Sequence, residues 1–128
     1  MSSQTLILSN KQISQKINRI AYQIFEDNHT EKEIVIVGIV QNGYLFATKL
    51  AKQLEKISNI KITLVELTIN KDNPISHLSK MNISPEIVNN KTVILVDDVL
   101  NTGKALIYGV KYLLDFPLKK MSTAVLVD

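Results

Sequence analysis

Two adjacent carboxylates, Asp97 and Asp98, stand between an apolar run and a small polar segment in VILVDDVLNTGKAL, residues 93–106. The four apolar residues before them predict a buried strand, and the folding of such a strand does not call for two acidic residues at its end. Adjacent carboxylates repel each other unless a cation or several hydrogen-bond donors meet them. Sugar hydroxyls together with Mg²⁺ would meet both needs, so the pair indicates a ligand site.

The polar segment that follows, Asn101-Thr102-Gly103, precedes a predicted helix. The unpaired amides of a first helical turn and the helix dipole favour an anion such as a phosphate. Gly103 allows close approach of the backbone, the Thr102 hydroxyl can add a hydrogen bond, and Lys104 can add charge. The simpler alternative is that Thr102 caps the helix and Gly103 makes a turn. The neighbouring aspartates favour the phosphate site.

Two common phosphate-binding motifs are excluded by spacing. A Walker A loop would need a glycine where Asp98 stands and a serine or threonine where Ala105 stands. The dinucleotide fingerprint G-x-G-x-x-G is absent, and GIVQNGYL has two glycines without a lysine after the second.

Alternating predicted strands and helices must position these residues. Near-continuous valine and isoleucine runs predict buried strands, and apolar residues at helical spacing predict amphipathic helices. This pattern predicts one α/β domain over residues 1–128, an open and mostly parallel twisted sheet with helices on both faces. Ligands of such sheets bind beyond the carboxyl ends of the strands. The predicted strands are 33–40, 60–69, 91–98 and 121–128, and the predicted helices are 11–25, 44–57 and 103–116.

Composition sets limits on the class of protein. The chain has 128 residues, a net charge of +3, no cysteine and no apolar run long enough to span a bilayer. We therefore expect a soluble, cytoplasmic protein without disulfides, thiolate metal sites or a membrane partner. The two histidines, His29 and His77, do not make a zinc site without cysteines. The scattered lysines indicate a solvated surface rather than a nucleic-acid footprint.

The segment VILVDDVLNTGKAL resembles the phosphoribosyl pyrophosphate (PRPP) signature of type I phosphoribosyltransferases. Four further segments occur in the same order as in the bifunctional pyrimidine-operon regulators that have uracil phosphoribosyltransferase activity. They are ILSNKQISQKINRIAYQIFEDN, IVGIVQNGYLFATKLAKQLEKI, ITLV and TAVLVD. The resemblance therefore covers most of the chain.

The resemblance implies transfer of a phosphoribosyl group from PRPP to a nucleobase, in pyrimidine or purine salvage, with Mg²⁺ as cofactor. Asp97 and Asp98 would be the catalytic pair, binding the ribose 2- and 3-hydroxyls and helping to place Mg²⁺. Residues 70–84 would form a lid. The 5-phosphate cradle would comprise Asn101, Thr102, Gly103, Lys104 and Ala105, and the pyrophosphate loop would comprise Val40, Gln41, Asn42 and Gly43.

The chain also departs from the family pattern. Gln41 and Asn42 replace a typical Thr-Arg, which removes a cation from the pyrophosphate loop. Ala105 replaces a threonine that contacts the phosphate, and Asn101 replaces the base-facing aspartate of purine-salvage relatives. Relatives continue past residue 128 into a segment that helps to hold the base. We therefore expect the C-terminal part of the fold to be absent and the base half of the site to be weakened.

Rival functions remain open. A non-catalytic regulator of the same fold would bind PRPP or a nucleotide without turnover, and the altered pyrophosphate loop favours it. A receiver-like signalling domain fits poorly, because the acidic pair of such a domain would belong to the first strand. Asp97 and Asp98 instead end the third predicted strand. The resemblance also implies a homodimer and allows RNA as a partner, although no basic stripe supports RNA binding.

Overall fold

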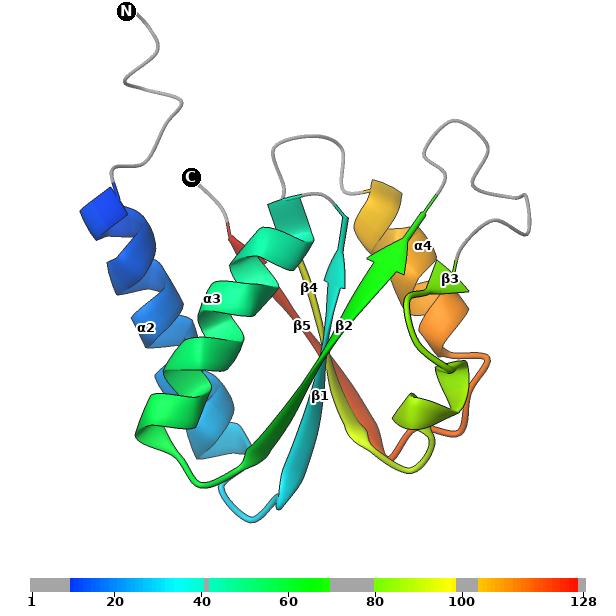
Figure 1. The fold of residues 1–128 in the computed structure, drawn as a ribbon, viewed down its shortest axis with the longest axis horizontal. Helices are drawn as coiled ribbons and strands as arrows, with labels where there is room; N and C mark the ends of the chain where they lie inside the picture. Colours follow the sequence, from blue (N-terminus) through cyan, green and yellow to red (C-terminus); the bar gives the residue numbers. More distant parts are fainter. Residues whose placement is uncertain (1–9, 41, 70–79, 99–103, 127–128) are drawn as a thin grey trace, which may run out of the picture.

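A computed structural model describes residues 10–40, 42–69, 80–98 and 104–126 of the chain. The five strands in this part of the chain form one sheet in the order β3-β2-β1-β4-β5 (Figure 1). The strands are β1 (Glu33–Ile39), β2 (Lys61–Thr68), β3 (Lys80–Met81), β4 (Thr92–Asp98) and β5 (Lys120–Leu126). The helices are α2 (Asn10–Asp27), α3 (Asn42–Ile57) and α4 (Lys104–Leu113), with a short 3₁₀ helix η1 (Pro85–Val88).

The sheet is parallel except at one edge. β1 pairs in parallel with β2 and β4, and β4 pairs in parallel with β5. Only β3 is antiparallel in the described sheet, through the Leu67–Met81 and Thr68–Lys80 pairs. The predicted mostly parallel α/β sheet is therefore confirmed, and each predicted strand and helix overlaps an observed one.

Helices cover both faces of the sheet, as Figure 1 shows: α2 and α3 lie on one face and α4 lies on the other. The central strand β1 contributes to two apolar cores because its side chains alternate between the faces. Ile34 and Ile36 belong to the core under α2 and α3, whereas Val35 and Val37 belong to the core under α4. This double coverage explains why β1 and β4 read as nearly continuous apolar runs.

The crossovers after β1 and β4 place their helices on opposite faces of the sheet. Because β1 and β4 are neighbours, their carboxyl ends make a topological switch point, where open α/β sheets bind ligands. The segments after these two strands, at residues 40–43 and 98–104, carry the residues that the sequence singles out.

The expected lid over residues 70–84 is corrected in its last part. The backbone N–H of Asn82 donates to the Glu66 carbonyl at 3.0 Å, and the Glu66 N–H donates to the Asn82 side-chain oxygen at 3.0 Å. Met81 is buried and pairs with Leu67 of β2. Residues 80–82 are thus held against the sheet edge, while residues 70–79 lie outside the described part of the chain.

Candidate functional site

The two aspartates end β4 in different environments. Asp97 is 6 % exposed, whereas Asp98, the last residue of the strand, is only partly buried. Consecutive residues of a strand point in opposite directions, so one carboxylate can be enclosed while its neighbour reaches the edge. The two carboxylates are therefore unequally exposed, and Asp98 is the more accessible one.

The start of α3 meets the end of β4 directly. Asn42 is the first residue of α3, and its side-chain Nδ2 donates a hydrogen bond to Oδ2 of Asp98 at 3.1 Å. These residues are 56 positions apart in the chain. The structure thus brings the predicted pyrophosphate loop and the predicted ribose site together at one edge.

Gly43 makes this close approach possible. A Cβ atom added there would lie 2.7 Å from the Val96 carbonyl oxygen and 3.1 Å from both the Cα and Oδ1 atoms of Asp97. Such distances are too short for a side chain without a backbone shift. The absence of a side chain at Gly43 therefore lets the first turn of α3 rest on the end of β4.

The loop before α3 is anchored on its other side as well. The backbone N–H of Val40 donates to the Leu67 carbonyl of β2 at 2.9 Å. At Gly38, a Cβ would lie 2.6 Å from Tyr44 Cα and 2.7 Å from Ala47 Cβ, so α3 also packs tightly on β1. Val40, Asn42 and Gly43 therefore lie together at the sheet edge; Gln41 is outside the described residues.

The start of α4 supplies the third part of the site. Lys104 begins the helix with an exposed side chain, whereas Ala105 is 9 % exposed and packs into the core under α4. Ala105 can thus offer its backbone amide to an anion, while its methyl group faces the core. The other predicted cradle residues, Asn101, Thr102 and Gly103, lie outside the described part of the chain.

The chemistry of the donors fits Mg²⁺ bound with a phosphorylated ligand. Mg²⁺ prefers oxygen donors and is usually held by one or two carboxylates, waters and ligand phosphates. Asp98 offers such a carboxylate at the edge, and Asp97 lies next to it. Among the residues that the structure describes, no group of three or more acidic, histidine or cysteine side chains could hold a metal ion. The ligand itself would have to complete the coordination.

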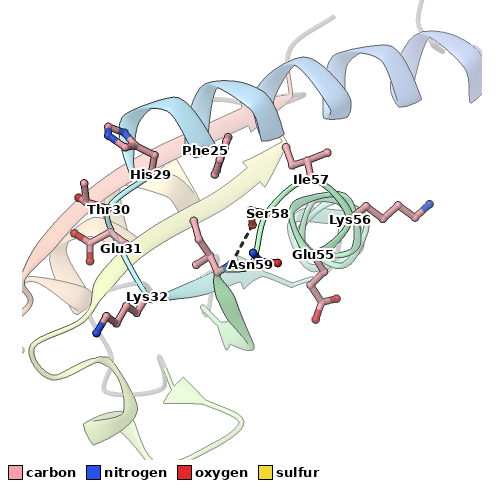
Figure 2. A pocket seen from close by; sticks show the side chains of 11 residues that line it. Phe25, His29, Thr30, Glu31, Lys32, Glu55, Lys56, Ile57, Ser58 and Asn59 are labelled. Atoms are coloured by element: carbon pink, nitrogen blue, oxygen red, sulfur yellow. Dashed lines mark hydrogen bonds between the residues drawn. The ribbon is translucent and has the colours of Figure 1, made fainter.

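A hollow lies at the opposite, amino-terminal edge of the sheet (Figure 2). Its volume is about 600 Å³, and it lies between the end of α2 and the end of α3. In Figure 2, Glu55 and Lys56 point away from the hollow, and the Ser58 hydroxyl accepts a hydrogen bond from the Ile60 N–H at 3.3 Å. None of the residues predicted for the site lines it. Its lining is rich in polar side chains, among them Thr30, Glu31 and Lys32.

The fold and site thus define an α/β protein whose acidic and amide-bearing loops meet at the switch point of a mostly parallel sheet. A model of the phosphoribosyl transferase domain matches residues 3–128. The chain belongs to the phosphoribosyltransferase family.

Curated relatives place the chain near one branch of that family. It is 32% identical to the bifunctional protein PyrR of Clostridioides difficile over 139 aligned residues, which cover 100% of this chain and 76% of that protein. It is 35% identical to the bifunctional protein PyrR of Brevibacillus brevis over 136 aligned residues, which cover 100% of this chain and 75% of that protein. The predicted resemblance to the type I family is confirmed.

Solved structures agree on the fold. A hypoxanthine-guanine phosphoribosyltransferase from Bacillus anthracis matches with a TM-score of 0.74 and 21% identity, covering 94% of this chain and 68% of that one. A hypoxanthine phosphoribosyltransferase from Staphylococcus aureus matches with a TM-score of 0.75 and 19% identity, covering 94% and 65%. Separately, no helix in the described residues has the length and apolar character that a membrane crossing requires.

The site residue that sequence reasoning interpreted incompletely is Asn42. The sequence marks it as the loss of a cation from the pyrophosphate loop, but the structure makes it the hydrogen-bond partner of Asp98. No local signal predicts that contact, because it depends on β1 and β4 being neighbours in the sheet.

Proposed function

We propose that this protein transfers the phosphoribosyl group of PRPP to a nucleobase and releases pyrophosphate. The observation that carries the proposal is the contact of the start of α3, at Asn42 and Gly43, with the Asp97–Asp98 end of β4, the strand that α4 follows in the chain. In a phosphoribosyltransferase these elements correspond to the pyrophosphate, ribose and 5-phosphate subsites. Family membership and this arrangement support the same reaction.

Each element has a distinct role in the proposed reaction. Asp98 accepts hydrogen bonds from ribose hydroxyls and, with Asp97 beside it, would hold Mg²⁺ on the ligand. Bound Mg²⁺ would supply positive charge to the departing pyrophosphate. The amides at the start of α4 would fix the 5-phosphate, with Lys104 adding charge at the rim. The chain would thereby orient the ribose between its 5-phosphate and its pyrophosphate.

Anion binding at a helix terminus contributes too little free energy to account for most of the catalysis. A helix amino terminus stabilises an anion by about 0.3 to 2 kcal/mol. Enzymes typically lower their reaction barriers by at least ~8 kcal/mol. The α4 cradle therefore anchors the substrate, and orientation of the reacting groups together with charge stabilisation on the pyrophosphate must provide the rest.

A second candidate is a regulator that binds PRPP or a nucleotide without turnover. The observation that favours it is the lack of any lysine or arginine in the sequence from Gly38 to Thr48, which spans the pyrophosphate loop. Without that cation, the leaving group would depend more heavily on Mg²⁺ and backbone amides. The expected homodimer, the cytoplasmic location and RNA as a partner stay predictions.

One experiment separates the candidates. The protein is incubated with PRPP, Mg²⁺ and each of uracil, hypoxanthine, guanine, xanthine and adenine, and pyrophosphate release is measured beside calorimetric titration with PRPP. Release that depends on one base supports the enzyme. Tight binding of PRPP without release for any base supports the regulator. If PRPP neither binds nor reacts, both candidates are wrong.

A further inference from the structure

The hydrogen bond between Asn42 and Asp98 joins the two loops of the candidate site through a neutral group. Asn42 is exposed at the start of α3, and Asp98 is partly buried at the end of β4. The amide Nδ2 lies 3.1 Å from the carboxylate Oδ2, which is within ordinary hydrogen-bond distance. The amide thus restrains an accessible carboxylate.

The backbone fixes where this contact forms. Gly43, the next residue, lets the turn approach so closely that an added Cβ would stand 2.7 Å from the Val96 carbonyl oxygen. Val40, on the other side of the turn, is hydrogen-bonded to Leu67 of β2. The position of Asn42 opposite Asp98 is therefore set by two anchored segments and not by one exposed side chain alone.

The neutral character of the donor decides what the contact can do. A lysine or arginine at position 42 would form an ion pair with Asp98 and cancel its charge within the protein. An amide orients the carboxylate and leaves its negative charge in place.

We propose that Asn42 is a positioning residue that holds the Asp98 carboxylate in place for a Mg²⁺-bound diphosphate ester while leaving the carboxylate's charge available to the cation. The proposal rests on the proposed binding of PRPP and extends it. In this arrangement Asn42 orients the Asp98 carboxylate. Mg²⁺ supplies the positive charge that a lysine or arginine in the pyrophosphate loop would otherwise provide.

The test is calorimetric titration of the whole chain with PRPP, in the presence of Mg²⁺ and again with EDTA, for the wild type and Asn42→Ala. Loss of one hydrogen bond should weaken PRPP binding with Mg²⁺ by about threefold to tenfold. With EDTA, where Asp98 has no cation to hold, the two proteins should bind equally within about twofold. A purely structural role for Asn42 would weaken binding equally in both conditions and would overturn the proposal.

Exchange of the two side chains provides a sharper test. Asn42→Asp alone places a second carboxylate against Asp98 and should weaken PRPP binding with Mg²⁺ by more than about tenfold. The double variant Asn42→Asp with Asp98→Asn restores an amide–carboxylate hydrogen bond with the partners exchanged. It should recover the thermal stability of the wild type but not its PRPP affinity. Recovery of affinity to within about twofold would overturn the proposal.

Asn59→Asp is the matched control, because Asn59 is an exposed asparagine at the opposite edge of the sheet. It makes the same change of charge and should leave PRPP binding unaltered. If the wild type itself fails to bind PRPP with Mg²⁺, the proposed function and this inference both fail. If the wild type binds and Asn42→Ala binds equally well, only the role of Asn42 is wrong.

Discussion

At the amino-terminal edge of the sheet a lysine pairs with a partly buried glutamate, whereas at the carboxyl-terminal edge a neutral amide binds an aspartate. Lys119 Nζ lies 2.9 Å from Glu31 Oε2, and a second pair of the same kind lies nearby. Asp98 instead accepts from Asn42. An ion pair cancels charge inside the protein, while an amide preserves the charge of the carboxylate it orients. The two edges therefore treat similar acidic residues differently, because Glu31 is paired with a cation and Asp98 is held by a neutral amide.

The two edges also differ in how their polar side chains point. The amino-terminal edge has an open hollow of about 600 Å³, but polar groups such as Glu55 and Lys56 point away from it (Figure 2). At the carboxyl-terminal edge, the side chain of Asn42 instead meets the carboxylate of Asp98. The candidate site is therefore proposed from the chemistry of its residues, and none of the residues predicted for it lines this hollow.

The largest expected effect comes from Asp98→Asn, which removes charge from the carboxyl-terminal edge. Mg²⁺-dependent PRPP binding should weaken by about 100-fold or more, roughly 2.8 kcal/mol. The free energy of unfolding should stay unchanged or rise, because the repulsion between Asp97 and Asp98 is relieved. Calorimetric titration and chemical denaturation measure the two quantities. A variant that loses stability yet binds PRPP normally when folded would assign Asp98 to the fold.

Gly43→Ala should affect both quantities, because it separates the first turn of α3 from the end of β4. The nearest obstacle is backbone, the Val96 carbonyl oxygen at 2.7 Å, which cannot rotate away. We expect a loss of about 1 to 3 kcal/mol in unfolding free energy and weaker PRPP binding. Denaturation and titration of the same preparation test both effects.

Gly109→Ala in α4 is the control for that substitution. Its nearest obstacles are the side-chain ends Leu95 Cδ2 at 3.0 Å and Ile39 Cδ1 at 3.1 Å, which can shift. Alanine also favours a helix interior by about 1 kcal/mol relative to glycine. This variant should keep PRPP affinity and most of its stability. Equal losses at the two glycines would mean that contact with the end of β4 is not what matters at Gly43.

The sequence predicts the fold well where local patterns are strong. The valine and isoleucine runs of β1 and β4 mark strands that are buried on both faces, and these strands are found as predicted. β3 is not predicted, because a strand of two residues carries no period, and η1, a four-residue 3₁₀ helix that begins at Pro85, is also too short to show one. Short elements are set by their neighbours and not by their own sequence.

The site shows a similar limit. The acidic pair and the glycine of the pyrophosphate loop can be found from residue types, spacing and resemblance. The bond from Asn42 to Asp98 joins residues 56 positions apart and requires the strand order of the sheet. The same holds for Glu31 and Lys119, which are 88 positions apart. The unequal burial of Asp97 and Asp98 also follows only from the packed structure.

The smallest expected effect is at the amino-terminal edge, in Lys119→Met. The hydrogen bond from Lys119 lowers the pKa of Glu31 below its usual value of 4.5. A carboxyl whose pKa is lowered by folding stabilises the protein above the pKa of the unfolded chain, and this contribution disappears as the pH falls through the lower, folded value. Lys119→Met should therefore be slightly less stable than the wild type at pH 7, and the difference should shrink on acidification below about pH 4.5. Urea denaturation across this pH range measures the difference.

PRPP binding at pH 7 should be unchanged, because the pair lies at the edge remote from Asp98. A loss of PRPP affinity in this variant would contradict the separation of roles between the two edges. A stability difference that stays constant with pH would mean that Glu31 is not the group that Lys119 stabilises.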